Sequence, residues 1–212
     1  GGVDAQLFSV WCDGDQANPY AWATREMDTL DAVVSRNPDK MVIVKNYKEL
    51  KQAIKNKKLA SMFGVEGGHM IEDNLDNLNT FYDRGTRYMT LTWNNSTSWA
   101  TSAMAETTKK DSLALTHKGL TDFGKQVVKR MNELGMVVDV SHVGEQTFWD
   151  VINTTTKPVM ASHSNAYALC PVFRNLKDEQ ILAIGKNGGV IDLNFYAGFV
   201  DSSFRSKEIK FI

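Results

Sequence analysis

Three side chains that could bind a metal ion each follow a short run of apolar residues. They are Glu66, His142 and His163, and the two histidines stand 21 residues apart, about one strand–helix unit. Short apolar runs are typical of parallel strands, whose carboxyl ends open onto one face where active sites lie. One carboxylate and two imidazoles suit Zn²⁺ or a similar divalent ion, which supplies hydroxide for hydrolysis at neutral pH by lowering the pKa of bound water.

Each of these residues also has a plain structural interpretation. Glu66 stands between two pairs of small or apolar residues and could occupy a surface turn, and a lone histidine at a strand end is often simply packed. The three together favour a metal site, because three strand ends in one parallel sheet converge on one rim.

Three further residues could assist this site. His69 lies three residues after the carboxylate and either hydrogen-bonds to a metal ligand or packs in the core. Asp139 lies within a strand, on the face opposite to its neighbours, where it either orients a ligand or is paired in the interior. Arg174 follows in a loop and either holds a substrate carboxylate with its guanidinium or caps the next helix at the surface.

The elements that must position these residues alternate between strand and helix. Apolar runs predict strands at residues 6–11, 59–65, 87–92, 136–141, 158–162 and 189–194. Helical spacing predicts helices at residues 20–35, 47–56, 74–84, 121–134, 145–153 and 177–186. Residues 93–118 are rich in Thr, Ser and Asn and are expected to form a long functional loop.

About six parallel strands fit either a doubly wound sheet or a (β/α)8 barrel. The barrel is favoured, because ligands from several strand ends are typical of it and no Gly-rich dinucleotide motif follows the first strand. Six strands do not close an eight-stranded barrel, so the fold class expected here is an incomplete (β/α)8 barrel that lacks two units. The whole chain, residues 1–212, is expected to form one partial domain.

The bulk composition excludes some functions. With 24 Lys and Arg against 25 Asp and Glu, the formal net charge is −1, and no basic stripe with interleaved aromatics marks a nucleic-acid partner. No apolar run approaches the roughly 18 residues that a membrane span requires. Cys12 and Cys170 stand outside any CxxC motif and either pair or remain buried thiols, so the compartment stays open.

Seven stretches of the chain together carry a resemblance to a known family. They are residues 64–69, 87–92, 119–124, 131–142, 162–164, 174–175 and 188–190. In this order they resemble the membrane dipeptidases (renal dipeptidase-like, peptidase family M19) of the amidohydrolase superfamily. The resemblance spans nearly the whole chain and is specific because it rests on all seven stretches.

This resemblance implies a (β/α)8 barrel with a dinuclear zinc centre that hydrolyses dipeptides. Glu66 matches the carboxylate that bridges the two metal ions, and His142 and His163 match the imidazole ligands of one of them. Arg174 matches the arginine that binds the carboxylate of the dipeptide. The family mechanism uses a metal-bound hydroxide to attack the peptide carbonyl, beneath the loop that follows Thr92.

The chain departs from the family pattern in three places. The His-x-Asp pair that binds the other metal ion does not occur, and the aspartate of the last strand is absent, so the chain is expected to be a fragment covering strands two to seven. The family often has a histidine after Leu-Thr, where this chain has Trp93 followed by Asn94 and Asn95. Asparagine amides can donate to an oxyanion, so Asn94 or Asn95 is predicted to take over that catalytic role.

The sequence is also compatible with two other functions. One is a different amidohydrolase-type enzyme that acts on an ester, a lactone or a small amide. The other is a non-catalytic remnant of the barrel, which the incomplete ligand set favours. The resemblance also allows a homodimer and an exported or membrane-associated location, but it decides neither.

Overall fold

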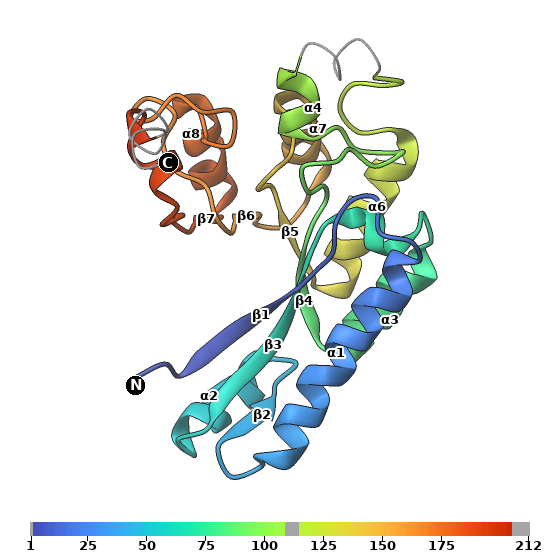
Figure 1. Cartoon of the computed structure of the whole chain (residues 1–212), viewed down its shortest axis with the longest axis vertical. Helices are drawn as coiled ribbons and strands as arrows, with labels where there is room; N and C mark the ends of the chain where they lie inside the picture. Colours follow the sequence, from blue (N-terminus) through green and yellow to red (C-terminus); the bar gives the residue numbers. More distant parts are fainter. Residues whose placement is uncertain (1, 109–114, 205–212) are drawn as a thin grey trace, which may run out of the picture. The chain divides into compact units, whose positions relative to one another are not determined.

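The computed structural model describes residues 2–108 and 115–204 (Figure 1). These residues form two compact units. The N-terminal unit holds the chain up to Met89 together with Glu133–Met136, and the C-terminal unit holds Thr90–Asn132 and the chain from Val137 onward. The prediction of one domain over residues 1–212 stays a prediction.

The N-terminal unit is built around strand β3 (Leu59–Glu66). Strand β1 (Ala5–Trp11) pairs with β3 in parallel along its whole length, which brings Trp11 opposite Glu66. Strands β2 (Met41–Ile43) and β4 (Thr86–Thr90) are also neighbours of β3, and β2 pairs with its first three residues. The parallel pairing explains the apolar run of β3, because a strand inside such a sheet is covered on both faces.

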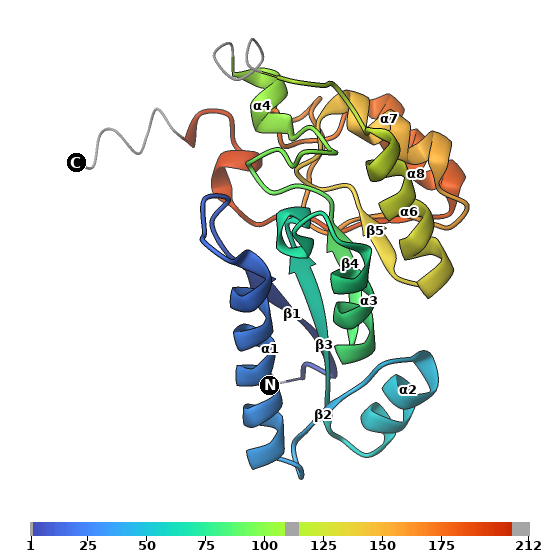
Figure 2. The ribbon, with the colours of Figure 1, turned by 90° about the vertical axis from the view of Figure 1, so that its right-hand side faces the viewer.

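Helices α1 (Pro19–Arg36), α2 (Tyr47–Lys55) and α3 (Leu75–Arg84) accompany these strands, and α1 runs alongside β1 and β2 (Figure 2). Helix α3 begins at Asn74, whose side chain accepts a hydrogen bond from the backbone of the first turn, and ends at Gly85 in the left-handed conformation. Arg84 joins α3 to α1, because its guanidinium lies 2.7 Å from the carboxylates of both Asp28 and Asp31. A short 3-10 helix, η1 (Gly68–Ile71), follows β3.

The C-terminal unit repeats the strand–helix alternation with shorter strands. Its elements are α4 (Ala103–Thr107), most of α6 (Asp122–Leu134), β5 (Val137–Asp139), α7 (Glu145–Thr154), β6 (Met160–Ala161), α8 (Asp178–Asn187), β7 (Val190–Ile191) and the 3-10 helix η2 (Ala197–Phe199). Strand β6 pairs in parallel with β5 on one side and β7 on the other. Apolar side chains of these strands and helices are buried, including Val138, Ala161, Val127, Phe148 and Ile184.

The predicted alternation is confirmed, with three corrections. The long loop predicted at residues 93–118 is wrong in part, because it contains α4, and residues 109–114 lie outside the described part. Strand β2 was not predicted, because three residues are too few to show a period. Strands β5, β6 and β7 are shorter than predicted. Among the described residues, no helix is both long and apolar enough to cross a membrane.

The junction of α8 and β7 has no room for a side chain at Gly189, which generates a prediction. A Cβ atom there would lie 2.3 Å from the backbone oxygen of Val159 and 2.9 Å from the side chain of Ile184. Because backbone cannot swing aside as a flexible side chain can, Gly189→Ala is expected to lower the free energy of unfolding by about 1–3 kcal/mol in urea denaturation.

The matched control is Gly185→Ala, four residues earlier within α8. A Cβ atom at Gly185 meets nothing within 4 Å, so this variant is expected to be as stable as the parent or to gain about 0.5–1 kcal/mol. Equal unfolding midpoints for the two variants would contradict the close approach at Gly189.

Candidate metal centre

Two histidines meet at the ends of neighbouring strands of the C-terminal unit. His142 follows β5 and His163 follows β6, and their Nε2 atoms lie 2.9 Å apart. The ring centroids are 4.9 Å apart with the planes at 62°. The structure therefore brings together the two imidazoles that the sequence placed one strand–helix unit apart.

In each imidazole, Nδ1, the nitrogen that does not face the other histidine, lies near an oxygen atom. Nδ1 of His142 lies 3.2 Å from the amide oxygen Oδ1 of Asn94, and Nδ1 of His163 lies 2.6 Å from the hydroxyl of Ser162. An amide oxygen only accepts, so Nδ1 of His142 carries the proton and its Nε2 presents a lone pair. An imidazole fixed in this way is the form that binds a divalent cation. The donor set of the pair thus fits a metal ion.

His142 has an unusual backbone conformation. Its φ of 67° lies in the left-handed region, which is uncommon for residues other than glycine and costs about 1–3 kcal/mol. The segment 94–106, here called the brace, holds this turn. The backbone N–H of Ala103 donates to the carbonyl of His142 at 2.7 Å, and that of Gly144 donates to the carbonyl of Thr101 at 2.8 Å.

Glu106 fastens the end of the brace to helix α7. Its carboxylate accepts hydrogen bonds from the backbone N–H groups of Glu145 at 2.7 Å and Gln146 at 3.4 Å, the first residues of α7. A carboxylate is favoured there because the first N–H groups of a helix have no partner within the helix. Gly144 makes the approach feasible, since a Cβ atom there would lie 2.5 Å from Cδ of Glu106.

Asp139 is fully buried at the end of β5, where it accepts four hydrogen bonds. Its Oδ2 accepts from the hydroxyls of Thr90 at 2.7 Å and Ser162 at 2.5 Å. Its Oδ1 accepts from the backbone N–H groups of Ser141 at 2.9 Å and Ser162 at 3.0 Å. Of the two roles predicted for Asp139, the geometry favours orienting a ligand, because one hydroxyl group separates it from His163.

Glu66 belongs to the N-terminal unit, where it is half-buried at the end of β3. Its Oε2 accepts a hydrogen bond from the hydroxyl of Ser9 at 3.3 Å. Glu66, His142 and His163 are all candidate metal ligands, a carboxylate and two imidazoles.

His69, also in the N-terminal unit, contacts a cysteine. Its Nε2 lies 3.4 Å from Sγ of Cys12, while its buried Nδ1 has no hydrogen-bond partner among the described residues. Burial lowers the pKa of His69 and raises the pKa of the Cys12 thiol to about 11, so both groups are neutral at physiological pH. Of the two roles predicted for His69, these contacts favour packing. Cys12 and Cys170 are both free thiols, not a disulfide.

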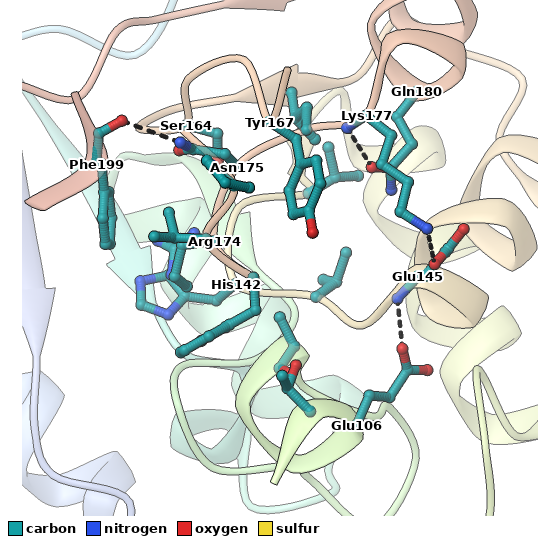
Figure 3. A pocket seen from close by; sticks show the side chains of 18 residues that line it. Glu106, His142, Glu145, Ser164, Tyr167, Arg174, Asn175, Lys177, Gln180 and Phe199 are labelled. Carbon is teal, nitrogen blue, oxygen red and sulfur yellow. Dashed lines mark hydrogen bonds and ion pairs between the residues drawn. The ribbon is translucent and has the colours of Figure 1, made fainter. Parts of the chain in front are cut away.

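Arg174 lines a pocket of about 450 Å³ in the C-terminal unit (Figure 3). The side chain is buried, and its guanidinium lies 5.4 Å from the ring centroid of Phe199. Asn175 shapes the loop, since its amide donates to the carbonyls of Cys170 and Phe199 at 2.8 and 2.9 Å. The buried position contradicts the alternative of a surface arginine, and Figure 3 shows Arg174 beside His142 on the pocket wall.

The two asparagines differ in their surroundings. Asn94 faces His142, and its backbone carbonyl accepts a hydrogen bond from the hydroxyl of Ser102 at 2.7 Å. Asn95 donates from its amide to the carbonyl of Ser96 at 3.5 Å, and its buried Oδ1 has no hydrogen-bond partner among the described residues. Asn94 is thus placed to hold an imidazole, whereas the amide of Asn95 makes one long hydrogen bond among the described residues.

Sequence reasoning missed several residues that shape this centre. Thr90, Ser162 and Glu106 were not singled out. Thr90 contacts Asp139, Ser162 contacts His163, and Glu106 contacts the first turn of α7. Ser162 had one usable signal, its place directly before His163 at a strand end. Glu106 had none, because its partner helix lies 39 residues away in the sequence.

Comparison with known proteins relates this chain to one peptidase family and to several solved structures. A family model described as membrane dipeptidase (peptidase family M19) matches residues 1–210. An amidohydrolase from Pseudomonas aeruginosa is 25% identical with a TM-score of 0.80, over 93% of this chain and 57% of that one. The probable dipeptidase PvdM from the same organism is 26% identical with a TM-score of 0.74, over 82% of this chain and 43% of that one.

A third solved structure shows the same fold at lower identity. It is a metallopeptidase from Rhodobacter sphaeroides bound to a phosphinate mimic of the dipeptide L-Ala-D-Ala, 22% identical with a TM-score of 0.80, over 91% of this chain and 62% of that one. The chain therefore spans from 43% to 62% of the length of these relatives. The matches confirm the predicted fold class, a (β/α)8 barrel that is incomplete in this chain.

Proposed function

Because this chain belongs to the membrane dipeptidase family, peptidase family M19, we propose that it forms the metal-binding part of a zinc-dependent dipeptidase. One observation carries the proposal: the Nε2 atoms of His142 and His163 lie 2.9 Å apart at neighbouring strand ends, beside a pocket lined by the buried Arg174. An imidazole pair of which His142 lines the pocket, together with the buried guanidinium of Arg174, suits a metal ion and a substrate with a free carboxylate.

His142 and His163 would hold one Zn²⁺ ion, and the family resemblance implies that Glu66 would add a carboxylate to a dinuclear centre. The chain has no His-x-Asp pair to complete the second site. When bound, the metal polarises the peptide carbonyl and activates water for its hydrolysis. The protein's part is to fix the imidazoles, which Asn94 and the brace do for His142.

The proposed substrate is a dipeptide whose terminal carboxylate is held by Arg174. A planar guanidinium matches a carboxylate in two parallel hydrogen bonds, and burial strengthens them. The pocket of about 450 Å³ is large enough for a ligand of this size. The phosphinate dipeptide mimic in the Rhodobacter sphaeroides structure supports the same ligand class. A homodimer stays a prediction.

The first experiment measures zinc binding by the purified protein with a competing chromophoric chelator. We expect zinc binding to weaken by more than about 100-fold in each of the variants His142→Ala, His163→Ala and Glu66→Gln. This is more than the loss of a residue that only hydrogen-bonds to a metal ligand would cost. His117→Ala, which removes a histidine outside the candidate group, serves as the control and is expected to bind as the parent does. Parent protein that binds no zinc would identify the non-catalytic remnant instead.

A second experiment separates a dipeptidase from another amidohydrolase. In the full-length enzyme, Arg174→Ala is expected to raise KM for a dipeptide by about 10–100-fold, the cost of a lost hydrogen bond to a charged group. The same variant should hydrolyse the corresponding dipeptide amide, which lacks the carboxylate, as the parent does. Arg174→Lys keeps the charge without the paired donors and should fall between. An unchanged KM for the dipeptide would favour an ester, lactone or small-amide hydrolase.

We further propose that Asn94 holds His142 while Asn95 donates its amide to the oxyanion that forms on the substrate carbonyl. In the full-length enzyme, Asn95→Ala is then expected to lower kcat by about 100-fold without loss of zinc, the usual cost of removing one such donor. Asn94→Ala is expected to weaken zinc binding as well as lower kcat/KM. Unchanged kcat/KM in both variants would contradict these roles.

A further inference from the structure

We propose that Ser162, clamped by Asp139, fixes the proton of His163 on Nδ1 and so keeps its Nε2 open as a metal-binding lone pair. This makes Ser162 a positioning residue. The inference rests on the proposed function only in naming His163 as a ligand, because the position of the proton is a property of the chain itself.

The hydroxyl of Ser162 lies between two strong partners. Its oxygen is 2.5 Å from Oδ2 of Asp139 and 2.6 Å from Nδ1 of His163. A third oxygen, Oγ of Ser141, is 3.4 Å away and already accepts the backbone N–H of His163 at 3.1 Å. The short contacts to Asp139 and His163 therefore decide how the hydroxyl is oriented.

The single proton of Ser162 settles the direction of both hydrogen bonds. An ionised carboxylate only accepts, and both oxygens of Asp139 already face N–H or O–H groups, so the serine proton points to Asp139. The serine oxygen can then only accept from His163, which requires the imidazole proton on Nδ1. The opposite tautomer would set two lone pairs 2.6 Å apart with no proton between them.

The same outcome is reached on His142 by a different route. There the amide oxygen of Asn94 accepts from Nδ1, so Nε2 again presents a lone pair. Two lone pairs facing each other at 2.9 Å repel unless a metal ion or a shared proton lies between them. The chain thus uses a serine–aspartate relay for one imidazole and an amide for the other, and both prepare the pair for a shared cation.

The test reads the tautomer directly in metal-free, ¹⁵N-labelled protein at pH 8.5, where imidazole is neutral. The chain has four histidines, so the ring nitrogens of His163 can be assigned with one His163→Gln variant in long-range ¹H–¹⁵N spectra. Free histidine favours the proton on Nε2. We expect His163 to carry it on Nδ1 in the parent and in Ser162→Thr, and to revert toward Nε2 in Ser162→Ala.

A second variant changes the direction of the relay without removing it. In Asp139→Asn the new amide can donate to Ser162, whose hydroxyl is then free to donate to Nδ1 and drive the imidazole proton to Nε2. The proposal is wrong if His163 of the parent protein carries its proton on Nε2, or if Ser162→Ala leaves the tautomer unchanged. The small Ser162→Ala change keeps the test decisive even if Asp139→Asn fails to fold.

Zinc affinity supplies an independent readout. Ser162→Ala is expected to weaken zinc binding by about 10–100-fold, as for other lost partners of a metal-binding imidazole, and Ser162→Thr should restore it. Ser164→Ala, on the other side of His163, is the matched control for both tautomer and affinity. If the tautomer behaves as expected but the parent protein binds no zinc, the proposed function fails while the relay stands.

Discussion

The buried carboxylate of Asp139 is the interaction on which the candidate centre depends. It accepts hydrogen bonds from Thr90 at the end of β4, from Ser141 after β5 and from Ser162 after β6. A carboxylate without these donors would be costly to bury, and the donors without the carboxylate would lose their acceptor. The carboxylate of Asp139 therefore holds together the ends of three strands, next to which His142 and His163 lie.

A second constraint acts on the backbone of His142. Its left-handed conformation is unfavourable by itself and persists only because the surrounding structure holds it. The brace supplies that hold through backbone hydrogen bonds to the carbonyl of His142 and from the N–H of Gly144, and Glu106 anchors the brace to α7. The described part of the segment predicted as a functional loop thus supports a candidate metal ligand.

The sequence predicted six strands and six helices because apolar runs and helix caps are local signals. Asn74 and Gly85, for example, mark the ends of α3 in the sequence as well as in the structure. Short elements were missed or misjudged: β2 and α4 have three and five residues, too few to show a period. Strand β5 ends earlier than predicted, because the chain after Asp139 turns so that Asp139 can accept the N–H of Ser141.

The sequence alone identified the side chains that could bind a metal ion or a substrate. Glu66, His142, His163 and Arg174 could be named as candidates because their chemistry and order along the chain are visible without coordinates. Only the tertiary structure decided that the two Nε2 atoms face each other and that Arg174 is buried at the pocket. It also revealed Ser162 and Glu106, since a hydrogen bond between residues 23 or 39 positions apart leaves no periodic trace in the sequence. The direction in which a side chain points, and its distance from other side chains, depend on packing, which local sequence patterns do not encode.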